Sequence, residues 1–329
     1  MSSTVAVWQR ELAGAVRDPA TLVRLLNLPQ DAVSVQAAQQ FRLLVPHSYL
    51  ARMKSGDWHD PLLRQVLPLD EELRVVEGFN HDPVGDQNAL VADGVLHKYQ
   101  GRVLLVTTGA CAVHCRYCFR RHFPYSESNP VKGEWESALA YLREHTDVRE
   151  VILSGGDPLT LSDERLASFF SQLQHIPHVI RVRFHTRLPV VLPSRIDAGF
   201  QQLLAQLPQQ KVMVIHANHA QELAATDVHD ALAALRASGV TLLNQAVLLR
   251  GVNDTVDAQA DLSESLFVQG VMPYYLHLLD RVAGAAHFEV TQAQAVQLLD
   301  ALRQRLPGFL VPKLVREVAG EKAKMPVTT

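Results

Sequence analysis

Short apolar runs rich in β-branched residues alternate with amphipathic stretches from about residue 102 onward. These runs predict six strands, at residues 102–108, 150–156, 179–186, 211–217, 241–249 and 272–279. The stretches between them, such as SALAYLREH and DERLASFFSQLQ, place apolar residues three and four positions apart, which is typical of a helix buried along one face. Strands that alternate with helices in this way predict βα units around a parallel sheet.

Two architectures fit this alternation. Six βα units suggest an α/β fold in the form of a partial (β/α)6 TIM-like barrel, whereas an open doubly wound sheet would produce the same pattern. In both, the chemistry is expected at the carboxyl ends of the strands. Residues before about 95 show helical spacing, as in ATLVRLLNL, and then become rich in Pro, Asp and Gly. We therefore expect a helical accessory segment at 1–95, the barrel at 96–308 and a carboxyl-terminal arm at 309–329.

Composition excludes several classes of protein. Of the 329 residues, 47% are hydrophobic and 20% are charged, which is ordinary for a globular protein with a sizeable core. The formal net charge is -3 and no run of Lys or Arg occurs, so a nucleic-acid partner is not expected. No stretch is long and apolar enough for a membrane span, and the first residues do not resemble a signal peptide. A cytoplasmic location is the expectation.

The three cysteines, Cys111, Cys115 and Cys118, stand in a C-x3-C-x2-C pattern directly after the first predicted strand. An odd number packed into eight positions argues against a disulfide framework. Three thiolates can bind three irons of a cubane cluster and leave the fourth iron open, whereas a structural zinc site takes four protein ligands. The alternatives are a zinc site completed by His114 or His122, and three buried cysteines without a function.

Three arginines, Arg116, Arg120 and Arg121, flank the cysteines. They are expected to lower the pKa values of the thiols and to offset the negative charge of a cluster. The spacing on its own supports an iron–sulfur site or a zinc site.

The sequence CAVHCRYC resembles the signature of the radical S-adenosylmethionine (SAM) enzymes. This resemblance implies a [4Fe–4S] cluster whose open iron binds the methionine part of SAM, and a partial barrel. The second predicted strand ends in SGGDPL, where Gly155, Gly156 and Asp157 match the glycine-rich turn of that family. The turn implies a place where bare backbone approaches the methionine end of SAM.

A wider set of segments resembles lysine 2,3-aminomutase across residues 97–327, among them HTRLPVVLPSRI, HANHAQE, LNQAVLLRGVND and MPYYLHLLD. That family is an isomerase family that uses pyridoxal phosphate, so the resemblance implies conversion of L-lysine to (R)-β-lysine by migration of the amino group. Lys324, followed two residues later by proline, matches the lysine that binds pyridoxal phosphate. Lys313 and Lys322 lack that proline.

Lysine as a substrate carries a carboxylate at one end and an ammonium at the other, so its pocket needs a cation and, a side chain's length away, acids. The resemblance assigns the carboxylate to Arg120 and the ammonium to Asp280 and Glu317. Glu317 stands where the family has an aspartate. Lys98 stands where longer relatives usually have an arginine beside the cofactor phosphate, so the resemblance implies that Lys98 contacts this phosphate. Further residues expected to line the cofactors are Tyr99, Arg187, His216, Asn218, Gln245 and Tyr275.

The shortness of the chain after Lys324 resembles the branch of the family that makes β-lysine for elongation factor P. This implies a separate lysyl ligase as a functional partner and an electron donor such as a flavodoxin or ferredoxin. The sequence is compatible with a homo-oligomer. Alternatives are a stand-alone aminomutase for lysine or glutamate and, from other classes, an iron–sulfur electron carrier or a zinc-stabilised binding module. The acidic Asp280 and Glu317 argue against glutamate.

Overall fold

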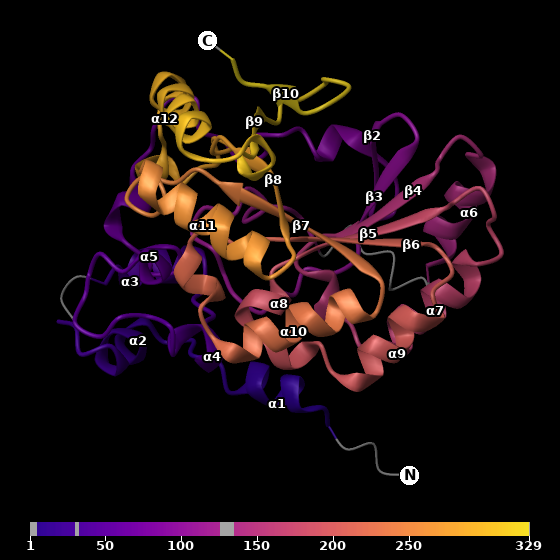
Figure 1. Cartoon of the computed structure of the whole chain (residues 1–329), viewed down its shortest axis with the longest axis horizontal. Helices are drawn as coiled ribbons and strands as arrows, with labels where there is room; N and C mark the ends of the chain where they lie inside the picture. Colours follow the sequence, from indigo (N-terminus) through magenta and orange to yellow (C-terminus); the bar gives the residue numbers. More distant parts are fainter. Residues whose placement is uncertain (1–4, 30–32, 126–134, 329) are drawn as a thin grey trace.

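The computed structural model describes residues 5–29, 33–125 and 135–328. Its centre is one ten-stranded sheet in which the strands follow one another in sequence order (Figure 1). The strands are β1 Leu90–Ala92, β2 Val95–Tyr99, β3 Arg102–Val106, β4 Glu150–Ser154, β5 Arg181–Thr186, β6 Gln210–Ile215, β7 Val240–Val247, β8 Met272–His277, β9 Lys313–Arg316 and β10 Met325–Pro326.

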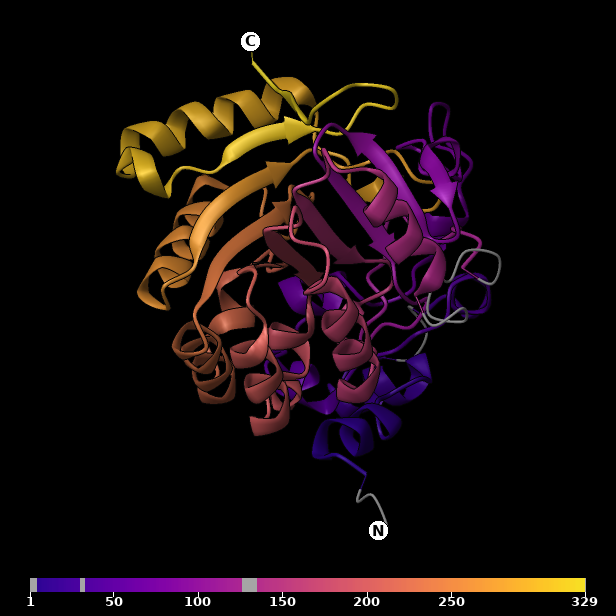
Figure 2. The ribbon, with the colours of Figure 1, turned by 90° about the vertical axis from the view of Figure 1, so that its right-hand side faces the viewer.

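The strands from β3 to β9 pair in parallel, whereas β1–β2, β2–β3 and β9–β10 pair antiparallel. A doubly wound sheet would reverse its strand order at a switch point, and no reversal occurs within the described strands. The sheet curves with its helices on the outside (Figure 2), and no pairing joins β1 to β10 in the described part of the chain. The partial barrel is therefore confirmed and the doubly wound alternative is wrong.

The outer helices are α6 Glu136–Glu144, α7 Asp163–Leu173, α8 Leu188–Val191, α9 Ala198–Gln206, α10 Thr226–Ala237, α11 Val256–Val268 and α12 Gln292–Arg305. Several begin where a short polar side chain accepts a backbone N–H, as Asp197 does from Phe200 and Thr255 from Ala258. Phe184 of β5 packs edge to face against Phe170 and Phe200 of these helices. Such contacts bury the sheet's outer face and fix the strands that carry the site.

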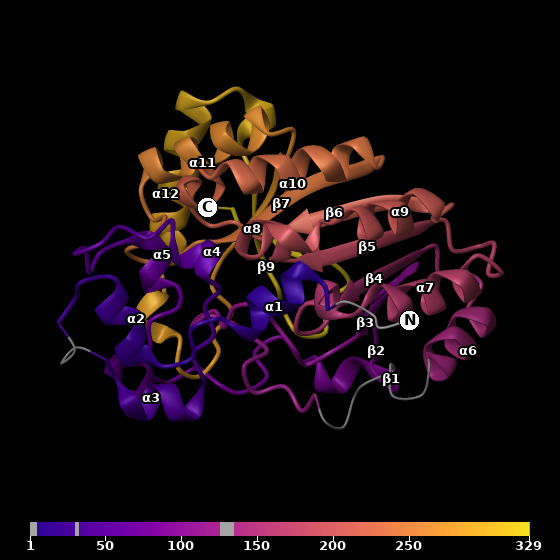
Figure 3. The ribbon, with the colours of Figure 1, turned by 90° about the horizontal axis from the view of Figure 1, so that it is seen from below.

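The amino-terminal segment contains α1 Val7–Ala13, α2 Pro19–Leu25, α3 Val35–Gln40, α4 His47–Leu50 and α5 Pro61–Arg64, which lie on one side of the barrel (Figure 3). Its buried residues, such as Leu22 and Leu62, belong to the same hydrophobic core as the barrel. The segment also contains β1, and the expected boundary at 95/96 falls at the start of β2. No helix among the described residues is long and apolar enough to cross a membrane.

Candidate active site

A cavity of about 590 Å³ opens at the carboxyl ends of the strands and continues into the barrel. Every candidate residue from the sequence lines it, although these residues come from segments far apart in the chain. The set comprises Lys98, Tyr99, Cys111, Cys115, Cys118, Arg120, Gly155, Gly156, Asp157, Arg187, His216, Asn218, Gln245, Tyr275, Asp280, Glu317 and Lys324.

The three cysteines lie on the loop after β3, and all three are free and partly exposed. The amino-terminal segment holds this loop, because the backbone N–H of His114 donates to Leu44 and that of Arg116 to Gln65. One ring nitrogen of His114 lies 2.8 Å from the carbonyl oxygen of Arg42, and one of His122 lies 3.3 Å from that of Ala283. In the described part of the chain, no three His, Cys, Asp or Glu residues are arranged to hold a single metal ion.

The flanking arginines behave differently from the expectation. Arg116 is fully buried and, like Arg121, pairs with Glu72, at 2.6 and 2.9 Å. Burial raises the pKa of the Cys111 thiol and raises that of Cys118 to about 11, and the latter rise occurs although the charges of Arg120 and Arg121 oppose it. Arg120 and Arg121 therefore lower the pKa of the Cys118 thiol as expected, but desolvation outweighs their charge and the net pKa is raised. Neither Arg116 nor any other arginine is among the causes of the raised pKa of Cys111.

The glycine-rich turn after β4 packs against the cysteine loop. A Cβ at Gly156 would lie 2.2 Å from the carbonyl oxygen of Ala110, and one at Gly155, where φ is +119°, would lie 2.7 Å from that of Thr108. Glycine is therefore required at both positions because the backbone of this turn lies against the backbone of the cysteine loop.

Asp157, the next residue of this turn, uses its carboxylate inside the protein. It accepts hydrogen bonds from Thr186 Oγ1 and the Arg187 N–H, both at 2.7 Å, and from the Leu159 N–H at 3.1 Å. Burial raises its pKa to about 6. Asp157 therefore joins the carboxyl ends of β4 and β5 and holds the backbone of Arg187.

At the other end of the cavity, Lys324 Nζ lies 3.2 Å from Glu317 Oε2 and 3.3 Å from His277 Nε2. Burial holds the pKa of His277 well below its usual value, so its neutral ring accepts a hydrogen bond from Lys324. Asp280 follows β8 and is partly exposed to the cavity, where burial raises its pKa to about 7. Its carboxylate has no hydrogen bond or ion pair with any described residue. Strands β8, β9 and β10 bring these four residues together.

A carboxylate that sequence reasoning missed organises the cations of this region. Asp86, which is buried, lies 2.6 Å from Lys98 Nζ and 2.7 Å from Arg120 Nε. Arg120 also donates to Ser154 Oγ at 3.1 Å, while the Tyr99 hydroxyl donates to Glu317. Asp86 lies in the Pro, Asp and Gly-rich stretch before β1, which gave no local signal of a site.

Arg102, Arg183 and His185 also line the cavity and were not predicted. The signal was present in RVRFHT of β5, where every second residue is polar although a central strand of a parallel sheet is usually apolar throughout. These alternate residues point into the barrel. The guanidinium of Arg102 lies over the Tyr99 ring, 4.6 Å from its centroid.

The remaining predicted residues form hydrogen-bonded pairs. The Gln245 amide lies 2.8 Å from His216 Nε2, which burial keeps neutral by lowering the pKa of His216 to about 3. Asn218 donates to the Tyr117 hydroxyl at 2.7 Å. The Tyr274 hydroxyl donates to that of Tyr275 at 3.0 Å.

Comparison with known proteins agrees with this geometry. A model of the radical SAM superfamily matches residues 105–258. The chain is 48% identical over 323 residues to the L-lysine 2,3-aminomutase of Escherichia coli strain K12, covering 97% of this chain and 94% of that protein. It is 47% identical to the enzyme of Haemophilus influenzae, covering 96% and 94%. With the enzyme of Clostridium subterminale it is 33% identical, covering 97% and 77%.

The family implies a [4Fe–4S] cluster, SAM and pyridoxal phosphate, and the cavity has donors that fit them. Three thiols suit iron. A lysine amine stands among aromatic and basic groups at the other end. The zinc module and the electron carrier explain neither this lysine nor the relatives. The chain belongs to the L-lysine 2,3-aminomutase family of radical SAM enzymes, which are isomerases.

Proposed function

We propose that this chain is a pyridoxal phosphate-dependent lysine 2,3-aminomutase that makes (R)-β-lysine from L-lysine. One observation carries the proposal: a single cavity holds three cysteine thiols at one end and the amine of Lys324 beside two carboxyl groups at the other. When bound, the cluster and SAM supply a radical that can break an unactivated C–H bond, and pyridoxal phosphate supplies the carbonyl through which an amino group migrates. The protein positions these groups and excludes water.

Lys324 is the residue that would hold pyridoxal phosphate. Its amine must be neutral to attack a carbonyl, and the neutral ring of His277, 3.3 Å away, would orient that amine by accepting a hydrogen bond from it. Lys98, Arg102 and Arg183 line the same cavity and would face the phosphate.

The substrate would lie between Arg120 and the two acids. Asp86 and Ser154 hold the Arg120 side chain at the wall of the cavity, where its guanidinium would bind the substrate carboxylate. Asp280, which has no partner among the residues that the structure describes, would pair with the distal ammonium, and Glu317 would add a second charge. A glutamate substrate would bring a carboxylate toward these acids, so repulsion disfavours it.

The biological role belongs to the same proposal. The product would be attached to elongation factor P by a separate lysyl ligase, and a flavodoxin or ferredoxin would supply the electron. A homo-oligomer and a cytoplasmic location complete the proposal.

Anaerobic turnover tests it. Reconstituted protein given dithionite, SAM and L-lysine should release β-lysine, whereas L-glutamate should give at most a trace of β-glutamate. Addition of elongation factor P and the ligase should then transfer the product to the factor. Failure to form β-lysine by protein with full cofactor loading would refute the aminomutase proposal, and β-lysine that the ligase does not use would refute only the biological role.

A further inference from the structure

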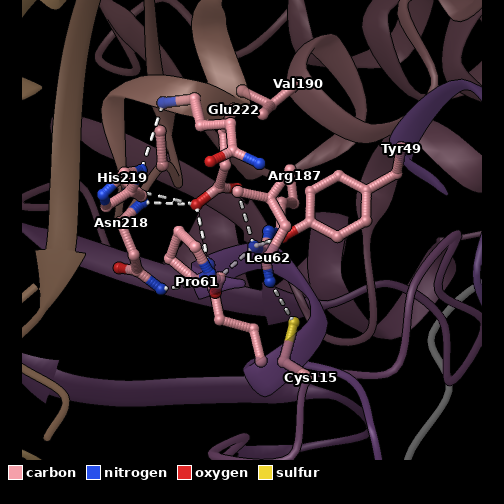
Figure 4. Close-up of polar contacts among 12 residues, drawn as sticks. Tyr49, Pro61, Leu62, Cys115, Arg187, Val190, Asn218, His219 and Glu222 are labelled. Atoms are coloured by element: carbon pink, nitrogen blue, oxygen red, sulfur yellow. Dashed lines mark hydrogen bonds and ion pairs between the residues drawn. The ribbon is translucent and has the colours of Figure 1, made fainter. Parts of the chain in front are cut away.

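Arg187, directly after β5, is the arginine that contacts a cysteine of the trio. Its Nη1 lies 2.6 Å from Cys115 Sγ (Figure 4). The same nitrogen lies 2.9 Å from the Tyr117 hydroxyl. The side chain is buried, and its backbone N–H donates to Asp157. No other Arg or Lys of the described residues donates a hydrogen bond to a cysteine sulfur. The flanking arginines are directed elsewhere: Arg116 binds Glu72.

The opposite side of the Arg187 guanidinium faces Glu222 (Figure 4). Nη2 donates to Glu222 Oε2 and to Gln65 Oε1, both at 2.7 Å. Glu222 is fully buried, and its Oε1 accepts the N–H of Asn218 at 2.9 Å and that of His219 at 3.2 Å. Its own loop therefore fixes this carboxylate independently of Arg187.

A stability role does not account well for this arrangement. The desolvation of two buried charges can exceed their mutual attraction, so a buried ion pair is a poor stabiliser compared with apolar packing. Because Arg187 contacts Cys115, which would bind the cluster, the pair also changes the electrostatic potential at the cluster. Hydrogen bonds to the sulfurs and net charge nearby set the reduction potential of an iron–sulfur cluster.

We propose that Arg187 and Glu222 act as a positioning pair that sets the reduction potential of the cluster. Reduction adds one electron, from dithionite or from a flavodoxin or ferredoxin, and takes up no proton. The positive charge and N–H of Arg187 at Cys115 stabilise the added negative charge and raise the potential, while the carboxylate of Glu222 limits that rise. The inference rests on the cluster that the family implies and requires neither lysine nor pyridoxal phosphate.

Potentiometric titration of the anaerobically reconstituted protein, followed by the electron paramagnetic resonance of the reduced cluster, tests the pair. Arg187→Gln should lower the equilibrium constant for reduction about tenfold, which is about 59 mV for one electron. Glu222→Gln should raise it by a similar factor, because it removes the negative charge and keeps a side chain of the same shape. Shifts of opposite sign are the signature of a tuning pair.

A matched control is Arg195→Gln. Arg195 is also fully buried and pairs with an aspartate, Asp163, at 2.7 Å, but it does not line the cavity. The reduction potential of the cluster in Arg195→Gln should equal that in the wild type. Iron is measured first, and if Arg187→Gln does not retain about four irons per chain, Arg187→Lys replaces it and should shift the potential downward by a smaller amount. Shifts of the same sign in the Arg187 and Glu222 variants, or no shift, would overturn the inference.

Discussion

The two ends of the cavity handle charge in opposite ways. At the cysteine end, two buried arginines are already paired with carboxylates: Arg187 with Glu222, and Arg116 with Glu72. At the lysine end, Asp280 faces the cavity without a partner among the described residues, and Glu317 is shared by Tyr99, Lys98 and Lys324.

This difference indicates what each end binds. Pairs that the protein completes by itself keep a fixed geometry, which suits a resident group whose electrons must be controlled. Acids that are unpaired or shared suit charged groups that enter and leave, because an arriving ammonium supplies the missing partner. Substitutions at the lysine end should therefore change cofactor or substrate binding and leave the iron content unchanged.

The largest effect is expected from Lys324→Ala, which removes the amine of the lysine end. The variant should lose the visible absorbance of protein-bound pyridoxal phosphate and at least about 10³-fold in turnover, which is roughly 4 kcal/mol. Its iron content should be unchanged, because the cysteine end is built separately. Absorption spectra, iron analysis and turnover measure these three outcomes.

Lys322→Ala is the matched control, since Lys322 is exposed and lies two residues away. It should keep both absorbance and turnover. Retained absorbance in Lys324→Ala together with its loss in Lys322→Ala would move the cofactor to the other lysine.

A smaller effect is expected from Asp280→Asn. This change leaves the distal ammonium of bound lysine with one charged partner fewer, and a hydrogen bond to a charged group contributes about 1.5–3 kcal/mol. The KM for lysine should therefore rise about tenfold to hundredfold, with cofactor absorbance and iron content unchanged. Steady-state kinetics test this, with Asp300→Asn as the control on the exposed side of α12. An unchanged KM in Asp280→Asn would contradict the role.

The smallest effect concerns pH. The Asp280 carboxyl has a pKa raised to about 7, chiefly by burial, with Glu317 and Asp86 adding to the rise and Lys324 and Lys98 opposing it. A raised pKa means that the group is neutral below about pH 7 and can bind an ammonium strongly only above it. The kcat/KM for lysine should therefore fall as the pH decreases through 7, since this ratio reports the free enzyme.

The same profile measured on Asp280→Asn decides the assignment. If Asp280 is the titrating group, the variant should lose the decline near pH 7 while keeping its lower overall kcat/KM. A decline that persists unchanged in the variant would assign it to another group.

The periodic patterns of apolar and polar residues predicted most of the fold. The six predicted strands correspond to β3–β8. Most central strands can be recognised from the sequence alone because their buried residues form one continuous apolar run. The short hairpin of β1 and β2 was missed although an Asp-Gly pair, Asp93–Gly94, marks its turn. Strands β9 and β10 were missed because they are short pieces completed by neighbours distant in sequence.

The candidate residues were found through motifs, whereas their partners were not. Glu222 and His277 lie within the segments HANHAQE and MPYYLHLLD, but the resemblance gave no role to either residue, and Asp86 lies outside every motif. Their roles arise from contacts such as that between Asp86 and Arg120, 34 residues apart. The net rise of the thiol pKa values could not be predicted for the same reason. Sequence proximity placed arginines beside the cysteines, but it did not show burial or that Glu72 would draw Arg116 away.

If the two ends of the cavity act together, a radical formed at the cysteine end acts on an amino acid held at the lysine end. Turnover of L-lysine deuterated at Cβ tests it most directly. With the wild-type enzyme, deuterium should appear at the 5′ carbon of the 5′-deoxyadenosine or SAM recovered from the reaction. With Lys324→Ala, no deuterium should appear there. Recovery of 5′-deoxyadenosine without deuterium, from enzyme that contains both cofactors and lysine, would contradict it.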